Sequence, residues 1–340
     1  KRQIQRMLQG KGLEGAGQEC DGNRQECGES RQEALEQTER AESGFVRFYY
    51  PMPDYRTPVS IYSDEYLPKK GDLTRVIPAY DYPRYHVTDM GEGFDVACED
   101  GLFDLYANSY LVLWSRDEGR LKQKSERIFI KYNKTRKDEF QIKTCICRRD
   151  GAEAAEKKVW YVEKAALSLE GMGHIWSFEE KYRRLSKQHR SLKMAEPTYC
   201  KEKNAVYFPY LTGRTWAERL GEDLSGGKLL FETLHGAMEQ IYDITPESRK
   251  KFLQTEEFLE VFGENLTAEE LALLAGDTAC EVSNIDALFE NILLTEEGNY
   301  CLDYEWVFTF PVPEHFVKYR ILYYFCEQYK SLMGRVSREE

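Results

Sequence analysis

Near its C-terminus the chain reads NIDALFENILL over residues 284–294 and YCLDYE over residues 300–305. Four residues separate Asp286 from Asn291, and an apolar run then leads through a turn to Asp303. We predict a hairpin here, with strands at residues 292–294 and 300–302. A loop would then carry Asp286, whereas Asn291 and Asp303 would flank the hairpin. Their side-chain oxygens can therefore converge on one hard cation.

Length and composition indicate a folded protein of two domains. The chain has 340 residues, of which 41% are hydrophobic and 13% aromatic, enough to bury one or two cores. The net charge of −12 argues against general nucleic-acid binding, which needs a basic surface. Nine cysteines without zinc spacing or a disulfide framework are typical of a reducing cytosol. No apolar run approaches the roughly 20 residues of a membrane-spanning helix, and no signal peptide is recognisable.

The first 43 residues differ from the rest of the chain. The chain begins at Lys1 rather than methionine, so we expect it to be the C-terminal part of a longer protein. A short helix is predicted at the start. Residues 10–42 are rich in Gly, Gln and Glu and nearly lack apolar side chains. Such a composition cannot offset the entropy of ordering, so a disordered insertion is expected there.

Residues 44–120 are the first segment with strand patterns. We predict strands at 45–50 and 106–114 and a short strand or loop at 61–67. The segment contains GF at 44–45, YYPMPDY at 49–55, IYSD at 61–64 and NSYL at 108–111. These motifs resemble the end of a class I methyltransferase domain, of the type encoded with bacterial surface-polysaccharide enzymes. The resemblance implies the terminal antiparallel strands of that sheet. Because the cofactor site of that fold lies in its first half, S-adenosylmethionine is expected only in a missing upstream domain.

Residues 121–210 alternate as strands and then change to helical spacing. Strands are predicted at 127–133, 140–148 and 157–165. A helix is predicted at 174–188, in which His174 is expected to be a packed, hydrogen-bonded histidine. The predicted buried face of this helix consists of Ile175, Phe178, Tyr182 and Leu185.

Residues 211–335 are predicted to be mainly helical. Helices are expected at 215–220 and 228–242, and residues 248–275 are expected to be helical and acidic, with a capping box from Thr267 to Glu270. The inner face of the final helix is predicted to comprise Phe316, Tyr319, Leu322, Tyr323 and Cys326.

The order and spacing of Asp286, Asn291 and Asp303 resemble the protein-kinase superfamily, in which Asp-x-x-x-x-Asn precedes Asp-Phe-Gly. The resemblance implies an α+β, bilobal fold with a small antiparallel-sheet lobe at 121–210 and a helical lobe at 211–335. It also implies that Asp286 is the catalytic base and that Asn291 and Asp303 bind Mg²⁺. The alternative is that Asp286 and Asn291 cap the loop and that Asp303 is a strand-end carboxylate.

The same resemblance implies a nucleotide site for ATP. Lys164 lies at the end of the strand stretch 159–164, like the lysine of Val-Ala-Ile-Lys that binds nucleotide phosphates, and Glu179 is its candidate ion-pair partner. A solvated strand-end lysine and an ordinary surface carboxylate are the alternatives. The backbone of Pro209, Tyr210 and Leu211 would face the adenine ring.

Several positions depart from the kinase pattern. No Gly-rich loop lies between the first two strands of the small lobe, and the residues before Asp286 are Asn-Ile rather than His-Arg. Glu305 occupies the place of the glycine, and we expect it to pair with Arg320 on the final helix. The segment from Trp306 to Pro313 is short. Such a segment disfavours protein substrates and favours a small-molecule or glycan acceptor.

A narrower resemblance is carried by SNID at 283–286, ENI at 290–292, DYEWVF at 303–308, PVP at 311–313 and YR at 319–320. These motifs resemble the kinase-like domain fused behind methyltransferases in polysaccharide gene clusters. The resemblance implies a Mg·ATP-dependent phosphotransferase acting on a sugar or other small-molecule hydroxyl in bacterial surface-polysaccharide synthesis. The implied partners are nucleotide, a glycan or small-molecule acceptor, and the chain's own or a partner methyltransferase domain.

Two alternatives stay open at this point. The chain can be a non-catalytic kinase-like binding or scaffold module attached to a methyltransferase whose catalytic half is missing here. Alternatively, the activity of the full-length protein belongs to that methyltransferase half. A cytoplasmic location is expected, with peripheral association with glycan assembly machinery at the inner face of the membrane left open.

Overall fold

The computed structural model describes residues 44–73, 90–150, 158–229, 231–263 and 266–333. The chain forms two compact units that divide between Met172 and Gly173. Both combine helices with mainly antiparallel strands, so the predicted α+β class is confirmed. The insertion predicted within residues 1–43 lies outside the described residues. Within the described residues, no helix is both long enough and apolar enough to cross a membrane.

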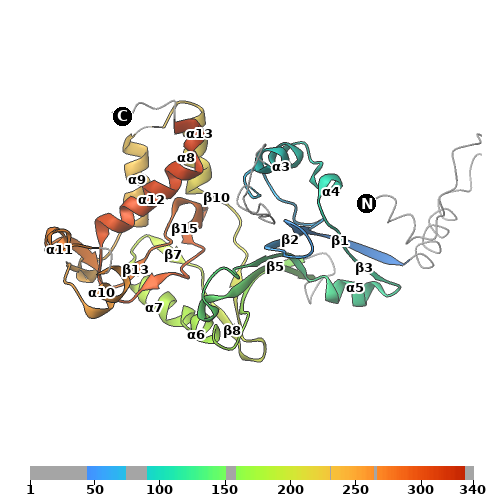
Figure 1. The fold of residues 1–340 in the computed structure, drawn as a ribbon, viewed down its shortest axis with the longest axis horizontal. Helices are drawn as coiled ribbons and strands as arrows, with labels where there is room; N and C mark the ends of the chain where they lie inside the picture. The colour runs from blue at the N-terminus through green and yellow to red at the C-terminus, as the bar shows by residue number, and fades with distance from the viewer. Residues whose placement is uncertain (1–43, 74–89, 151–157, 230, 264–265, 334–340) are drawn as a thin grey trace, which may run out of the picture. The chain divides into compact units, whose positions relative to one another are not determined.

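The first unit contains an antiparallel sheet with the strand order β3-β1-β2-β4-β5-β6. Figure 1 labels β1, β2, β3 and β5 of this sheet. Its strands are β1 (Phe45–Met52), β2 (Ser60–Ser63), β3 (Leu111–Ser115), β4 (Arg127–Tyr132), β5 (Ile142–Asp150) and β6 (Lys158–Ala166). Its helices are α3 (Met90–Glu99), α4 (Phe103–Tyr106), α5 (Glu118–Lys124) and the 3₁₀ turn η1 (Asp138–Phe140). Ser60 and Ile61 of β2 pair with Lys131 and Ile130 of β4. Strands on both sides of residue 120 therefore belong to one sheet.

An aromatic cluster forms the core under β1 and β2. The ring of Phe103 meets those of Tyr50 and Tyr62 edge-on, at centroid distances of 5.8 and 6.0 Å. Because Phe103 is buried at the start of α4, residues 103–106 are helical, and the strand predicted at 106–114 begins only at Leu111. That prediction was wrong in its first half, since burial of Phe103 outweighs the strand propensity of the following residues.

The second unit contains three small sheets, with strand orders β10-β14-β15-β7, β11-β12-β17 and β13-β16. Its strands are β7 (Leu192–Met194), β8 (Thr198–Cys200), β9 (Ala205–Pro209), β10 (Arg214–Thr215), β11 (Arg249–Lys251), β12 (Thr278–Cys280), β13 (Ser283–Asn284), β14 (Ile292–Thr295), β15 (Gly298–Cys301), β16 (Val307–Phe308) and β17 (Val312–Pro313). Its α-helices are α6 (Met172–Trp176), α7 (Phe178–Gln188), α8 (Trp216–Ser225), α9 (Phe231–Ile241), α10 (Glu256–Phe262), α11 (Ala268–Leu274), α12 (Glu314–Gln328) and α13 (Lys330–Met333). Short 3₁₀ turns are η2 (Lys201–Lys203), η3 (Pro246–Ser248) and η5 (Phe289–Asn291).

The helix predicted at 174–188 is divided into α6 and α7 at Ser177. The Ser177 hydroxyl donates to the carbonyl oxygen of His174 at 2.6 Å, at the point where α6 ends. Ile175, Phe178 and Leu185 are buried, as predicted. Tyr182 is only half-buried, and Lys181 is buried in its place. A lysine enters this face because its ammonium group finds a carbonyl partner, described below.

Two helical predictions in the C-terminal part were wrong in detail. The buried residues of α12 are Glu314, Val317, Ile321 and Phe325, whereas the predicted Tyr319, Tyr323 and Cys326 are exposed. The segment 248–275 is not continuously helical, because β11 and the separate helices α10 and α11 divide it. Within it, the capping box from Thr267 to Glu270 is confirmed at the start of α11.

Candidate active site

The predicted hairpin is confirmed as β14 and β15. Its register runs from Ile292 opposite Cys301 to Thr295 opposite Gly298, with a two-residue turn between the strands. Gly298 has φ +123°, a backbone conformation that favours glycine. The amide of Leu302 also donates to the carbonyl oxygen of Asn291 at 2.9 Å, which continues the ladder by one step. Asn291 and Asp303 therefore lie at the same, open end of the hairpin.

Side-chain amides close the loop that carries Asp286. Asn291 Nδ2 donates to the carbonyl oxygen of Asp286 at 2.9 Å, and the amide N–H of Asp286 donates to Asn284 Oδ1 at 3.0 Å. Asn284 Nδ2 in turn donates to the carbonyl oxygen of Asp303 at 3.2 Å. Asn284 is buried and thus ties the base loop to the segment of the second aspartate. The sequence analysis gave Asn284 no structural role, although an Asn two residues before a loop aspartate is a known turn signal.

Arg320 of α12 contacts the same loop. Its terminal nitrogen lies 3.6 Å from Oδ1 of Asp286, and its Nε donates to the carbonyl oxygen of Ile285 at 3.1 Å. The predicted pairing of Arg320 with Glu305 is therefore wrong. The prediction paired two charges near in sequence, but the guanidinium of Arg320 contacts residues 285–286, whereas the carboxylate of Glu305 contacts His174.

Glu305, two residues after Asp303, is held by residues of α6 and α7. Its Oε1 lies 3.1 Å from Nε2 of His174, and its carbonyl oxygen accepts a hydrogen bond from Lys181 Nζ at 2.6 Å. All three side chains are buried, so the expectation of a packed, hydrogen-bonded His174 is confirmed. The amide of Glu305 donates to Oδ1 of Asp303 at 3.2 Å. Helices α6 and α7 thereby fix the backbone that follows Asp303.

Tyr304, between Asp303 and Glu305, is buried in the core. Its hydroxyl donates to the carbonyl oxygen of Ala195 at 2.6 Å, and its ring meets Phe178 and Phe208 edge-on, at 5.5 and 6.0 Å. Burial raises the pKa of the Tyr304 hydroxyl well above its ordinary value, so it stays a neutral donor. Asp303 and Glu305 thus flank a residue that cannot move without disturbing the core.

The predicted nucleotide residues lie in both units. Lys164 belongs to β6 of the first unit, opposite Thr144 of β5, and is buried, so the alternative of a solvated strand-end lysine is wrong. Glu179 is exposed on α7 of the second unit, and its pairing with Lys164 stays a prediction.

The predicted adenine-facing segment begins where β9 ends. Pro209 is the last residue of β9 and is exposed, whereas Tyr210 and Leu211 are half-buried. The facing of their backbone toward adenine stays a prediction.

The oxygen atoms at the open end of the hairpin fit a hard cation. Asp303 offers a carboxylate, and Asn291 offers its amide oxygen, because its Nδ2 already donates to the loop. Among the described residues, no three His, Cys, Asp or Glu side chains gather as a metal-binding group. A cation here would therefore take few protein ligands and fill its shell with water and phosphate oxygens, as Mg²⁺ commonly does.

No protein-family model and no curated protein sequence matches the chain. Among solved structures, it is similar to aminoglycoside phosphotransferase APH(2")-Ib bound to ADP, at 14% identity and a TM-score of 0.29, over 63% of this chain and 84% of that chain. The complex of APH(2")-IIa with streptomycin and ATP has 14% identity and a TM-score of 0.28 over the same shares. Macrolide 2'-phosphotransferase MphH from Brachybacterium faecium has 12% identity and a TM-score of 0.30, over 60% and 77%. TM-scores this low assign neither a fold nor a function to the chain.

Proposed function

We propose that the chain is a phosphotransferase that moves the γ-phosphoryl group of ATP to the hydroxyl of a sugar or another small molecule. The proposal depends on one observation above all. The side-chain amide of Asn291 closes the loop of Asp286 at 2.9 Å, at the hairpin end where Asp303 also lies. A candidate base and two candidate cation ligands therefore share one hydrogen-bonded segment.

Asp286 is the proposed base. Its side chain is partly exposed, and Arg320 orients its carboxylate through the contact at 3.6 Å. A base of this kind accepts the proton of the acceptor hydroxyl when the two oxygens approach within about 2.6–3.2 Å. The bonds from Asn284 and Asn291 would hold the loop still while the acceptor binds.

Asn291, Asp303 and Lys164 are proposed to hold Mg·ATP. When bound, Mg·ATP supplies the phosphoryl group and the cation that neutralises its charge. Asn291 and Asp303 would ligate the cation through oxygen, and Lys164 would contact the phosphates. Glu179 would pair with Lys164, and the backbone of Pro209–Leu211 would face the adenine.

The acceptor is proposed to be a glycan or another small hydroxyl compound in bacterial surface-polysaccharide synthesis. Only residues 306–313 separate the Asp303 segment from α12, and β16 and β17 occupy part of them. This short connection favours a small acceptor over a protein. Within this proposal, residues 44–120 are the end of a methyltransferase-like domain whose catalytic half precedes the chain. The protein would work in the cytoplasm, alone or at the membrane surface where glycans are assembled.

A second candidate function is a non-catalytic kinase-like module that braces a methyltransferase or binds nucleotide or glycan. Two observations favour it. The connection between β4 and β5, residues 133–141, contains no glycine that could cradle phosphates. A buried glutamate, Glu305, stands where the kinase pattern has glycine, and His174 and Lys181 hold it in place.

Calorimetry with Mg·ATP, followed by a transfer assay, distinguishes the two candidates. Asp303→Asn should weaken metal-dependent ATP binding at least about tenfold, because a neutral amide replaces the charged carboxylate ligand of the cation. Asp286→Asn should bind ATP normally but lose at least about 100-fold in turnover, the usual contribution of a general base. Glu290→Gln is the matched control, since Glu290 is exposed in the same loop. ATP binding without turnover by the wild type would favour the non-catalytic module, and turnover that Asp286→Asn leaves unchanged would exclude Asp286 as the base. No binding by the wild type would refute both nucleotide roles.

A further inference from the structure

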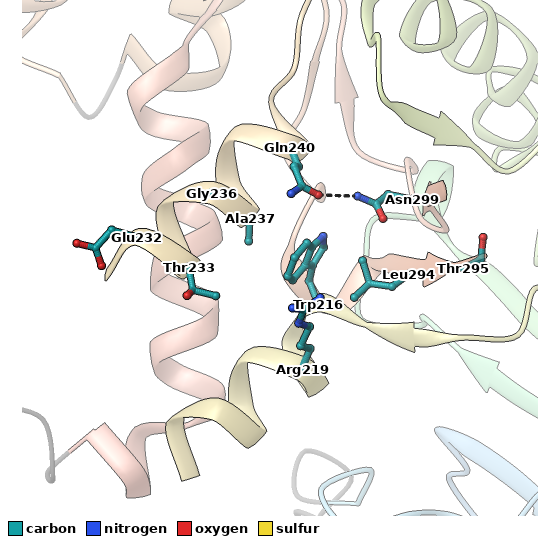
Figure 2. Close-up of a pocket in the computed structure, with 10 residues that line it drawn as sticks. All are labelled: Trp216, Arg219, Glu232, Thr233, Gly236, Ala237, Gln240, Leu294, Thr295 and Asn299. Carbon is teal, nitrogen blue, oxygen red and sulfur yellow. Dashed lines mark hydrogen bonds between the residues drawn. The ribbon is translucent and has the colours of Figure 1, made fainter. Parts of the chain in front are cut away.

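An open cavity of about 470 Å³ lies in the second unit between α8, α9 and the β14–β15 hairpin (Figure 2). Leu294, Thr295 and Asn299 line it, so it meets the hairpin at its turn. The proposed catalytic residues are at the opposite end. Thr295 is four residues from Asn291 along β14, which corresponds to about 13 Å at the rise of a strand. The cavity is therefore a separate feature, and its volume suits a small molecule.

The wall of the cavity contains a buried hydrogen-bond donor without a partner. Trp216, the first residue of α8, lines the cavity and is only 5% exposed. Its indole nitrogen has no exposed surface and no hydrogen-bond partner among the described residues. Buried donors are nearly always paired in native proteins. The N–H of Trp216 thus has an unused hydrogen bond, which an acceptor atom from outside the chain can take once a neighbouring side chain moves.

A bridge of two amides lies beside this donor. Asn299 Nδ2 donates to Gln240 Oε1 at 3.1 Å, which links β15 to α9, and Figure 2 shows the Trp216 nitrogen on the side of this pair. Gln240 is exposed and can move. When it does, a ligand oxygen can reach the indole N–H, and both amides can donate to and accept from the same ligand.

Charges of both signs border the cavity. The guanidinium of Arg219 lies over the Trp216 ring at 5.1 Å, and the carboxylate of Glu232 is exposed on α9. Both residues line the cavity. Because one cationic and one anionic side chain border the cavity, the lining selects neither sign of ligand charge. Neutral groups that both donate and accept suit the whole wall.

We infer that this cavity binds a neutral polyhydroxyl compound, a mono- or disaccharide unit. Sugar hydroxyls both donate and accept, so one ring can accept from the N–H of Trp216 while it bonds to Gln240 and Asn299. This site lies apart from Asp286 and does not require phosphoryl transfer, so it stands whether or not the proposed function holds.

The test follows the indole signals of the full chain by ¹⁵N NMR during titration. The probes are methyl α-glucopyranoside, methyl α-mannopyranoside, methyl α-galactopyranoside and maltose. The chain has five tryptophans, and the signal that Trp216→Phe removes belongs to Trp216. We expect at least one saccharide to shift this signal in a saturable manner. Calorimetry should then show binding at least tenfold weaker in Trp216→Phe and unchanged in Trp176→Phe, whose ring lies outside the cavity lining.

Asn299→Ala is the second variant, because Asn299 is only half-buried and its truncation leaves the core intact. It should also weaken binding at least tenfold, and circular dichroism checks that each variant is folded. The inference is overturned if none of the saccharides shifts the signal, or if both folded variants bind as the wild type does. It is also overturned if only inorganic phosphate or spermidine shifts the signal, since the ligand is then charged.

Discussion

His174 Nε2 lies 3.1 Å from Oε1 of Glu305, and both side chains are buried. Lys181 adds a hydrogen bond of 2.6 Å to the carbonyl oxygen of the same glutamate. Burial of a carboxylate is unfavourable unless its oxygens are paired, and His174 provides this pairing. Together, His174 and Lys181 hold both the side chain and the backbone of Glu305. The amide of Glu305 donates to Oδ1 of Asp303, so the contacts of Glu305 with His174 and Lys181 also position the backbone next to this proposed cation ligand.

Truncation of Glu305 should therefore destabilise the protein. Glu305→Ala leaves the buried His174 imidazole without its carboxylate and opens a cavity, so we expect a loss of about 2–3 kcal/mol in the free energy of unfolding. Urea titration measures this loss. Glu180→Ala is the control, since Glu180 forms an exposed ion pair with Arg183 and its loss should leave the stability nearly unchanged. Equal effects of the two variants would show that the buried contact contributes nothing.

Arg320 should hold the loop of Asp286 in place. Arg320→Met removes the contact with Asp286 and the hydrogen bond to the carbonyl oxygen of Ile285. Loss of about 1–1.5 kcal/mol of such interactions corresponds to roughly tenfold faster amide exchange of the loop. Hydrogen-exchange mass spectrometry of peptides covering residues 284–291 measures the rate. Arg183→Met on the exposed side of α7 should leave it unchanged, and unaltered exchange in Arg320→Met would exclude the role in the loop.

The buried face of α12 can be tested by two truncations. Ile321 is 1% exposed and Tyr319 is 62% exposed, although the sequence analysis placed Tyr319 inward. Ile321→Ala should lower the free energy of unfolding by about 3 kcal/mol, because it leaves a cavity. Tyr319→Ala should lower it by less than about 1 kcal/mol. Urea unfolding of both variants checks the assignment, and the reverse order would restore the face predicted from sequence.

This helix shows where periodicity fails. Aromatic and aliphatic residues occur on nearly every side of α12, so several faces fit the helical spacing equally well. The β14–β15 hairpin was predictable because its strands pair locally across a turn that glycine favours. The burial of Phe103 was not, since it depends on contacts with Tyr50 and Tyr62, which are distant in sequence.

In the candidate site, too, the local features were predictable from the sequence and the long-range contacts were not. Asp286, Asn291 and Asp303 could be named from spacing, because they lie on one local segment. The partners of this segment could not be named. Glu305 meets His174 across 131 positions of the chain, and Lys181 across 124. Nothing in local composition links such residues, so the sequence paired Glu305 with the nearer Arg320 instead.

His189 should make stability depend on pH. Burial lowers the pKa of His189 to about 4 from its ordinary value of 6.5, and nearby Asp243 only partly opposes this effect. Between these values the unfolded chain binds a proton that the folded protein does not. The stability is therefore complete above pH 6.5 and falls as the pH decreases toward 4, by roughly 3 kcal/mol for this group.

Urea unfolding at several pH values between 4 and 7 measures this dependence. Carboxylates also titrate in the lower part of this window, so the informative quantity is the difference between the wild type and His189→Gln. The variant should show a slope smaller by up to about one proton per molecule. Parallel curves for the two proteins would mean that His189 takes up its proton in the folded state.

Two glycines of the second unit should respond to alanine in opposite directions. A Cβ atom at Gly213 would collide with the carbonyl oxygen of Leu294, whereas, apart from its own helical turn, no heavy atom of the described residues lies within 4 Å of one at Gly236. Gly213 precedes β10, whose Arg214 pairs with Leu294, so the collision would push β10 away from β14.

Gly213→Ala should therefore lower the free energy of unfolding by about 1–3 kcal/mol, the range expected when a backbone contact must shift. Gly236→Ala lies within α9 and should raise it by up to about 1 kcal/mol, because alanine favours the helix. Thermal and urea unfolding of the two variants check the pair. A neutral Gly213→Ala would mean that β10 and β14 are less closely packed than the structure shows, and a destabilising Gly236→Ala would mean that the space beside α9 is filled.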